Sequence, residues 1–214
     1  MLKIHLETLD KQRQEAFKKL FAFKKDGCLA GGTALSLQIN HRKSVDFDIF
    51  LPKPLSPQFF RRVTEILGKD IKAKLNTGDL LLIETPQKIQ VHFVYIWYKK
   101  LYPAIKTASI DLEAVGDIAA NKAYTIGRRA AWRDYADLFY LLKNKLTTLE
   151  KIIKDARKKF EGEFVEAQFL QQLCYFKDMT ISPIEWIGSV YSPEDIELFL
   201  EKEVKDYLDN KLNL

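Results

Sequence analysis

The stretch GGTALSLQINHRKSVDFDIF, residues 31–50, constrains the fold more than any other part of the chain. Gly31-Gly32 follows the short apolar run CLA, which predicts a buried strand broken by a turn. The next residues have the length of a two-turn helix, and Thr33 is the expected cap. VDFDIFL then alternates apolar and acidic residues as a half-buried strand does, and Pro52 ends it. We therefore expect strand, glycine turn, helix and strand in immediate succession.

The two aspartates of the second strand belong to one face. Side chains at i and i+2 of a strand point the same way, so Asp46 and Asp48 project together while Phe47 and Ile49 face the core. Buried carboxylates are costly unless a cation neutralises them. Mg²⁺, or Mn²⁺ in its place, accepts such a pair together with water and substrate phosphates. The glycine turn fits that chemistry, since free N–H groups at a helix start attract phosphate. The alternative is a chance D-x-D at a solvated strand end.

The rest of the chain predicts an α+β fold. DLLLIET and KIQVHFVYIWY form a hairpin-like pair of strands, and residues 103–111 are open between loop and short strand. Helices are expected over 2–25, 56–67, 117–129, 133–145, 148–160, 163–176 and 193–211, with Thr147 and Ser192 as helix starts. This indicates a small mixed β-sheet flanked by helices, with a helical C-terminal part. We expect a core domain over 1–112 and a helical domain over 113–214 packed on it.

Composition limits the partners only broadly. The net charge of +5 and the pI of about 9.0 permit a polyanion such as RNA, DNA or nucleotide. No apolar run approaches the roughly 18 residues of a membrane span, and the charged N-terminus does not resemble a secretory signal. We therefore expect a cytoplasmic protein without a membrane partner.

The segment beginning at the glycine pair resembles the AbiEii/AbiGii toxin family, within the DNA polymerase β-type nucleotidyltransferase superfamily. Members commonly show G-G-T-A-L followed by H-R-x-S-x-D-h-D, where h is apolar. The matching residues here are Gly31-Gly32-Thr33-Ala34-Leu35, His41-Arg42, Ser44, Asp46 and Asp48. DIAANKAYTIGRRAAWRDYADLFYLL resembles a second family segment, which places Lys122, Arg128 or Arg129, Asp134 and Asp137. With a weaker third block, the resemblance spans roughly residues 15 to 205.

The resemblance implies a nucleotidyltransferase that moves an NMP group from an NTP to an acceptor. Asp46 and Asp48 would bind Mg²⁺ or Mn²⁺, and the nucleotide-binding residues would be Gly31, Gly32, Thr33, Arg42, Ser44, Arg128 and Arg129. Arg42 either touches phosphate or neutralises Asp46, and Ser44 is expected to orient an aspartate by a hydrogen bond. Relatives act as toxins of type IV toxin–antitoxin or abortive-infection systems, and some modify tRNA ends. RNA is therefore the expected acceptor, with a tRNA 3′ end as the narrower expectation and a protein or small molecule as the alternative. A cognate antitoxin would act without a stable complex.

Several candidates keep an alternative. Lys122 shares a helix face with apolar residues, so it either contacts the triphosphate or snorkels to solvent. Arg128 and Arg129 either reach phosphate or complement a helix C-terminus. Asp134 either orients Lys122 or stabilises a helix start. Trp97, Tyr98 and Tyr102, beside Lys99-Lys100, either stack on bases or form a core edge.

The chain departs from the superfamily at the third carboxylate, which commonly serves as base. The corresponding strand offers Gln90, His92 and Val94, and none is acidic. His92 occupies the expected position and a neutral imidazole accepts a proton; Glu84 is the fallback. The rival hypothesis is a catalytically inactive nucleotidyltransferase-fold protein that binds nucleotide, RNA or a protein partner.

Overall fold

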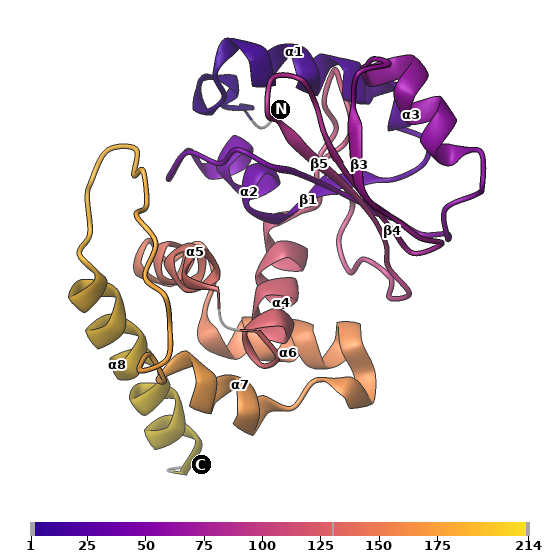
Figure 1. Ribbon diagram of the computed structural model, residues 1–214. Helices are drawn as coiled ribbons and strands as arrows, with labels where there is room; N and C mark the ends of the chain where they lie inside the picture. Colours follow the sequence, from indigo (N-terminus) through magenta and orange to yellow (C-terminus); the bar gives the residue numbers. More distant parts are fainter. Residues whose placement is uncertain (1–2, 130, 213–214) are drawn as a thin grey trace. The chain divides into compact units, whose positions relative to one another are not determined.

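The computed structural model describes residues 3–129 and 131–212 (Figure 1). The chain divides into two compact units, residues 1–114 and 115–214, and each has its own hydrophobic core. The first unit contains the sheet and the second is helical. No helix within the described ranges has the length and apolar character needed to cross a membrane.

The first unit is built on a five-stranded mixed sheet. Its strands are β1 (Cys28–Ala30), β2 (Phe47–Leu51), β3 (Lys72–Asn76), β4 (Leu80–Glu84) and β5 (Gln90–Tyr95). They lie in the order β1-β2-β5-β4-β3. β2 and β5 are parallel, and the other neighbours are antiparallel. The predicted α+β class, with a small mixed sheet flanked by helices, is confirmed.

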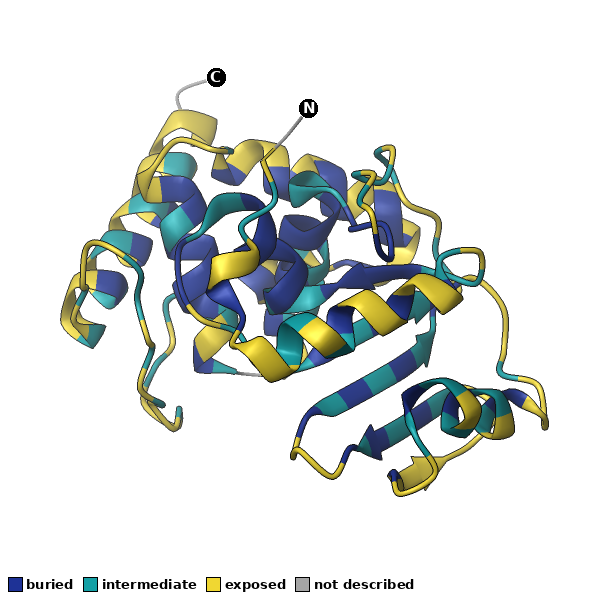
Figure 2. Cartoon of the chain, turned by 90° about the horizontal axis from the view of Figure 1, so that it is seen from above, coloured by how far each residue is buried: buried dark blue, intermediate teal, exposed yellow. Residues whose placement is uncertain are grey.

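One face of this sheet forms the core. The helices of the first unit are α1 (Lys11–Lys19), α2 (Gly31–Ile39) and α3 (Phe59–Leu67), with 3₁₀ turns at Leu6–Thr8 and Leu20–Phe23. Phe17 stacks on Phe47 with ring centroids 6.4 Å apart, and Phe93 meets Phe23 at 4.9 Å and Phe59 at 5.1 Å. Figure 2 shows the resulting alternation of buried and less buried residues along the strands. Asp48, the acidic residue of β2, therefore belongs to the opposite face.

Three local predictions were wrong. The helix expected over 2–25 is a shorter α1 between two 3₁₀ turns, because Asp10 caps it by accepting from the Arg13 amide at 2.8 Å. The strand β3 was not expected, because KAKLN has no buried face that a sequence pattern could reveal. It forms through its antiparallel pairing with β4. Thr33 is the third residue of α2 rather than its cap, which is Ala30 without a side-chain bond.

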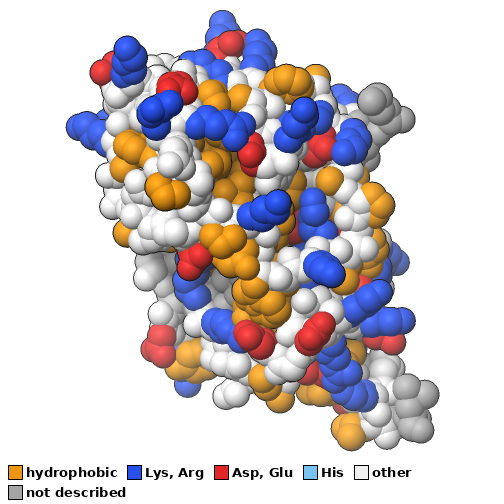
Figure 3. All heavy atoms as spheres, turned by 90° about the vertical axis from the view of Figure 1, so that its right-hand side faces the viewer, with side chains coloured by type: hydrophobic (Ala, Val, Ile, Leu, Met, Phe, Trp, Pro, Cys, Tyr) orange, Lys and Arg blue, Asp and Glu red, His pale blue; other side chains and the backbone are white. Residues whose placement is uncertain are grey.

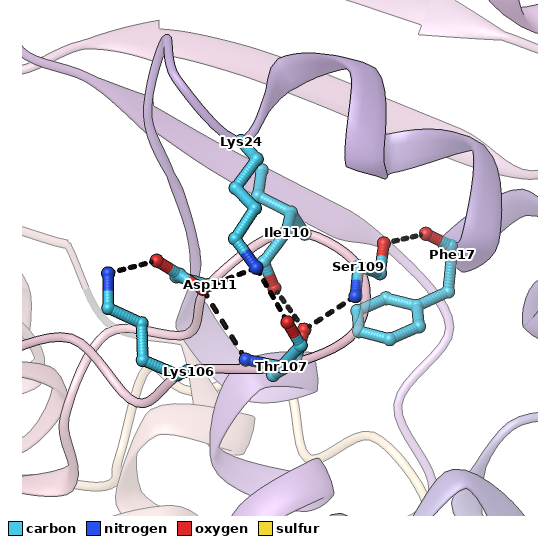
Figure 4. Close-up of polar contacts among 7 residues, drawn as sticks. All are labelled: Phe17, Lys24, Lys106, Thr107, Ser109, Ile110 and Asp111. Atoms are coloured by element: carbon cyan, nitrogen blue, oxygen red, sulfur yellow. Dashed lines mark hydrogen bonds and ion pairs between the residues drawn. The ribbon is translucent and has the colours of Figure 1, made fainter.

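The segment left open between loop and strand is a loop anchored to β1 and α1 (Figure 4). Only single bridges join Ile105 and Leu29 to Leu112 among the described residues. Ser109 donates its hydroxyl to the carbonyl of Phe17, and Asp111 accepts from Lys106 Nζ at 2.6 Å. The loop is therefore ordered by side-chain bonds rather than by a ladder of strand pairing.

The second unit contains five α-helices in its described part. They are α4 (Val115–Ile126), α5 (Trp132–Lys143), α6 (Leu149–Phe160), α7 (Glu166–Leu173) and α8 (Pro193–Leu212), with a 3₁₀ turn at Glu161–Glu163. Their core includes the fully buried rings of Tyr135, Phe139 and Phe169. All five predicted helices are present, with two corrections. Thr148 rather than Thr147 caps α6, and α4 ends before Arg128 and Arg129.

Candidate active site

The first glycine of the pair lies directly against the second aspartate of the strand. Gly31 adopts φ +65°, which other residues rarely accept. A Cβ added to it would lie 2.5 Å from Asp48 Oδ2, well inside contact distance. Glycine is therefore required at this position by backbone and space together. As a result, the start of α2 and the carboxylate of β2 adjoin.

The second glycine makes room for a guanidinium group. A Cβ on Gly32 would lie 2.6 Å from Arg42 Nη2 and 3.3 Å from Ser44 Oγ. Arg42 is buried, with 3 % of its surface exposed, and donates to the Lys43 carbonyl at 2.9 Å. A guanidinium group beside the positive end of a helix is unfavourable by itself. An anion bound there is attracted by both the guanidinium group and the helix start. The arrangement thus favours phosphate binding at this helix start.

Hydrogen bonds from α1 and α2 hold the segment that carries the aspartates. Thr33 Oγ1 lies 2.8 Å from Ser44 Oγ and donates to the carbonyl of Asp46. Arg13 Nε donates to the Val45 carbonyl at 2.9 Å. Thr33 therefore fixes the segment that leads into β2. Its bond to Asp46 joins residues 13 positions apart, which a local sequence pattern does not reveal.

The two carboxylates suit a divalent cation. Asp48 is in β2, Asp46 precedes it by two residues, and Phe47 between them is fully buried on the other face. Within residues 3–129 and 131–212, no lysine or arginine forms an ion pair with either aspartate. Two hard oxygen donors with no lysine or arginine paired to them in the described residues fit Mg²⁺, which keeps water and phosphate as further ligands. A cage of three or more protein ligands does not occur in the described part of the chain.

His92, the sequence candidate for the third-acid position, lies beside Asp48. It is the direct neighbour of Asp48 across the parallel pair β2–β5, and Nδ1 lies 2.8 Å from Asp48 Oδ1. This hydrogen bond, assisted by the charges of Asp48 and Asp46 and opposed by burial, raises the pKa of His92. The tautomer that donates from Nδ1 to Asp48 leaves Nε2 as an acceptor. The Gln90 amide, with Oε1 3.4 Å from Nε2, can donate to it only with its NH₂ group turned toward the ring.

Glu84 is a weaker candidate for the base. Lys74 and Lys88 lie 2.7 and 3.2 Å from its carboxylate. Their hydrogen bonds lower the pKa of Glu84, first through Lys74 and then through Lys88. A carboxylate held in its charged form by two lysines is a poor proton acceptor, so the structure favours His92 over this fallback.

The second block of candidates forms a cluster in the helical unit. Lys122 of α4 places Nζ 2.7 Å from Asp134 Oδ1 and 2.6 Å from Asp137 Oδ2, both on α5. The side chain of Lys122 is 7 % exposed and that of Asp137 is fully buried. Lys122 therefore does not snorkel to bulk solvent. Asp134 contacts Lys122, as the alternative in which Asp134 orients the lysine requires. The contact between Lys122 and Asp137 was not predicted from the sequence.

The two arginines after α4 differ in their surroundings. Arg128 lies over the ring of Tyr124, 3.7 Å from its centroid, and donates to the Glu163 carbonyl at 3.0 Å. Arg129 is exposed. Because both follow the last helical residue, the alternative of a basic helix end remains as good a description of them as phosphate binding.

Comparison with known proteins assigns the first unit. Residues 17–106 match the family model described as nucleotidyl transferase AbiEii toxin, type IV TA system. This confirms the resemblance found in the sequence: the matched segment is an AbiEii-type nucleotidyltransferase domain, and it contains the glycine pair, both aspartates and His92. The prediction that the chain is a nucleotidyltransferase is confirmed by the same match. The second block, from Lys122 onward, lies outside the matched residues.

Similarity to individual proteins extends over nearly the whole chain. An uncharacterized protein of Aquifex aeolicus (strain VF5) is 29 % identical over 214 residues, covering 96 % of this chain and all of that protein. The structure of the nucleotidyltransferase toxin MenT4 from Mycobacterium tuberculosis has a TM-score of 0.62 at 16 % identity, covering 91 % of this chain and 82 % of that one. JHP933 from Helicobacter pylori has a TM-score of 0.56 at 18 % identity, covering 98 % of each chain. These two structures show that the fold is shared.

Proposed function

We propose that this chain, which carries the AbiEii nucleotidyltransferase domain, transfers an NMP group from an NTP to an RNA acceptor in the presence of Mg²⁺ or Mn²⁺. The observation that carries the proposal is the contact between Gly31 and Asp48, because it joins a phosphate-binding helix start to a cation-binding carboxylate. A tRNA end is the acceptor that we expect. The proposal includes a toxin role in a type IV toxin–antitoxin system, which the family match supports, and we add to it a cytoplasmic location and an antitoxin that forms no stable complex.

In this proposal, different residues of the first unit bind the cation and the phosphates. Asp46 and Asp48 would hold the cation, which supplies charge neutralisation and polarisation of the phosphates when bound. The N–H groups of Gly31, Gly32 and Thr33 would donate hydrogen bonds to phosphate oxygens, because the first amides of a helix have no intrahelical acceptor. Arg42, beside Gly32, adds positive charge, and Ser44 fixes Thr33. In the in-line displacement, the acceptor hydroxyl oxygen bonds to the α-phosphorus and pyrophosphate leaves; the rate depends mostly on positioning and electrostatics.

In this proposal, His92 is the general base that removes the proton from the attacking hydroxyl. With Nδ1 bonded to Asp48, its Nε2 is oriented to accept a proton. We further propose that Lys122 neutralises phosphate charge, with Asp134 orienting its ammonium group. Arg128 and Arg129 remain candidates for phosphate or RNA backbone contact.

The test is transfer of label from each α-labelled NTP to total cellular RNA, with Mg²⁺ or Mn²⁺, followed by identification of the labelled RNA. We expect one RNA class to gain label and Asp46→Asn to abolish the gain. The absence of an acid at position 92 favours one rival, a nucleotide- or RNA-binding protein without catalysis. That rival is supported if no RNA gains label with any NTP while NTP binding persists and still depends on Asp46.

A further inference from the structure

We propose that a basic, aromatic-lined pocket at the ends of β1, β2 and β5 binds the single-stranded end of the acceptor RNA. The pocket has a volume of about 690 Å³ and is lined only by residues of the first unit. This inference rests on the proposed function, since it names where that function holds its acceptor. None of the cation- and phosphate-binding residues assigned above lines the pocket.

The pocket is positively charged. Five lysines and two aspartates line it: Lys24, Lys25, Lys99, Lys100, Lys106, Asp26 and Asp111. Both aspartates are already neutralised, since Asp26 pairs with Arg62 at 2.8 Å and Asp111 with Lys24 at 3.1 Å. Figure 4 shows Lys24 and Lys106 on either side of Asp111.

Two of the lysines keep their charge available. Lys25 and Lys99 are exposed and form no ion pair within the ranges that the structure describes. Lysines without a protein partner gain most from a phosphate backbone, because binding there releases condensed counterions. The face in Figure 3 likewise shows Lys and Arg side chains around exposed hydrophobic ones.

An exposed indole supplies the second element of single-strand recognition. Trp97 lines the pocket and is 52 % exposed, which is unusual for so large an apolar side chain. Its ring meets Tyr98 edge-on, with centroids 5.6 Å apart. The indole is half exposed and its neighbour is perpendicular rather than stacked on it, so part of its surface is available for stacking on an unpaired base. Lysines beside an accessible aromatic ring favour a single strand over an acidic protein surface.

The pocket begins close to the carboxylate face of the sheet. Cys28 and Phe50, which line it, are paired across β1 and β2, and Ala30 is paired with Asp48. Phe50 is two residues beyond Asp48, so the two lie on the same face roughly 7 Å apart along the strand. An RNA single strand held by the pocket can therefore present its terminal ribose hydroxyl to Asp48 and His92.

The experiment measures RNA binding without NTP, so that no transfer is needed for the readout. The probe is a fluorescent single-stranded RNA with a free 3′ hydroxyl, and its Kd is measured by anisotropy over a series of salt concentrations. The variants are Lys25→Gln/Lys99→Gln and Trp97→Ala. The control, Lys69→Gln/Lys72→Gln, removes the same charge at the opposite side of the sheet, where Lys72 belongs to the edge strand β3. Thermal unfolding of each variant checks that it folds.

We expect the pocket lysine variant to raise Kd for RNA several-fold and to reduce the slope of log K against log salt by about 1.4, as loss of two phosphate contacts requires. Trp97→Ala should raise Kd about fivefold or more at every salt concentration. The Kd for NTP should not change. If wild-type protein transfers no label but RNA binding depends on these residues, the proposed function fails and the pocket assignment stands.

Three results would overturn the assignment. The first is a Kd for RNA that changes no more in the pocket variants than in Lys69→Gln/Lys72→Gln. The second is a loss of NTP affinity in the pocket variants, which would make the pocket part of the nucleotide site. The third is competition by polyglutamate as strong as that by unlabelled RNA, which would indicate an acidic protein partner.

Discussion

Asp48 contacts Gly31 on one side and His92 on the other. Its Oδ1 lies 2.8 Å from His92 Nδ1, and its Oδ2 faces Gly31 so closely that no Cβ fits between them. One carboxylate thus joins the phosphate-binding turn, the cation position and the candidate base. Because each oxygen has a different neighbour, substitutions around Asp48 separate these roles.

Removing either carboxylate tests the cation position directly. Asp46→Asn and Asp48→Asn should each lower the rate of NMP transfer by about 10²-fold or more, since a neutral amide no longer attracts the cation that stabilises phosphate charge. Measurement is by initial rate of label transfer at saturating Mg²⁺. Asp79→Asn is the matched control, because Asp79 is an exposed aspartate of the same unit. Equal rates in all three variants would remove both aspartates from the mechanism.

The contact between Gly31 and Asp48 predicts an asymmetry between two glycines. Gly31→Ala forces a methyl group to within 2.5 Å of Asp48 Oδ2, so it should displace the carboxylate and abolish transfer as well as lowering stability. Gly68 also has a positive φ, +124°, but an added Cβ meets nothing within 4 Å. Gly68→Ala should therefore cost about 1–2 kcal/mol of unfolding free energy and leave transfer intact. Circular dichroism melts and transfer rates on both variants make the comparison; retention of transfer by Gly31→Ala contradicts it.

The hydrogen bond to Asp48 makes the contribution of His92 to stability depend on pH. The pKa of His92 is raised in the folded chain, so its stabilisation is fully present below the unfolded value of about 6.5 and is lost as pH rises through the folded value. His92→Gln should therefore lower Tm at pH 6 by about 1–3 °C and change it less at pH 9. Thermal melts in chelator-treated buffer measure this difference. The same loss of Tm at both pH values would show that His92 contributes only through packing.

Part of this site follows from sequence because its determinants are local. The strand pattern places Asp48 opposite the core face marked by Phe47, as the structure shows, whereas β2 begins only at Phe47 and Asp46 precedes it. The partner of Asp48 is not predictable in that way. His92 meets Asp48 only through the register of two parallel strands, which depends on how the whole sheet pairs.

The strand β3 and the Thr33 bond were missed for a related reason. KAKLN has no apolar face, and it becomes a strand because β4 pairs with it. Thr33 looks like a cap by its position after the glycines, but its hydroxyl bonds to Ser44 and Asp46 beyond the end of α2. Contacts that depend on tertiary structure override local preference in both places.

The buried cluster of Lys122 allows its structural and chemical roles to be separated. Lys122→Met removes the cation that lies 2.6 Å from the fully buried Asp137, so it should lower the free energy of unfolding by about 3 kcal/mol or more. In the double variant Lys122→Met/Asp137→Asn, no unpaired charge remains at Asp137, and much of that loss should be recovered. Urea unfolding of the two variants and of Asp137→Asn gives the coupling between the residues.

Transfer activity then distinguishes the alternatives for Lys122. If the lysine neutralises phosphate charge, the stable double variant remains inactive, because the ammonium group is still missing. If the lysine is structural, transfer returns together with stability. Asp134, the second partner at 2.7 Å, is retained in both variants, so the comparison isolates the ammonium group from the acid that we propose to orient it.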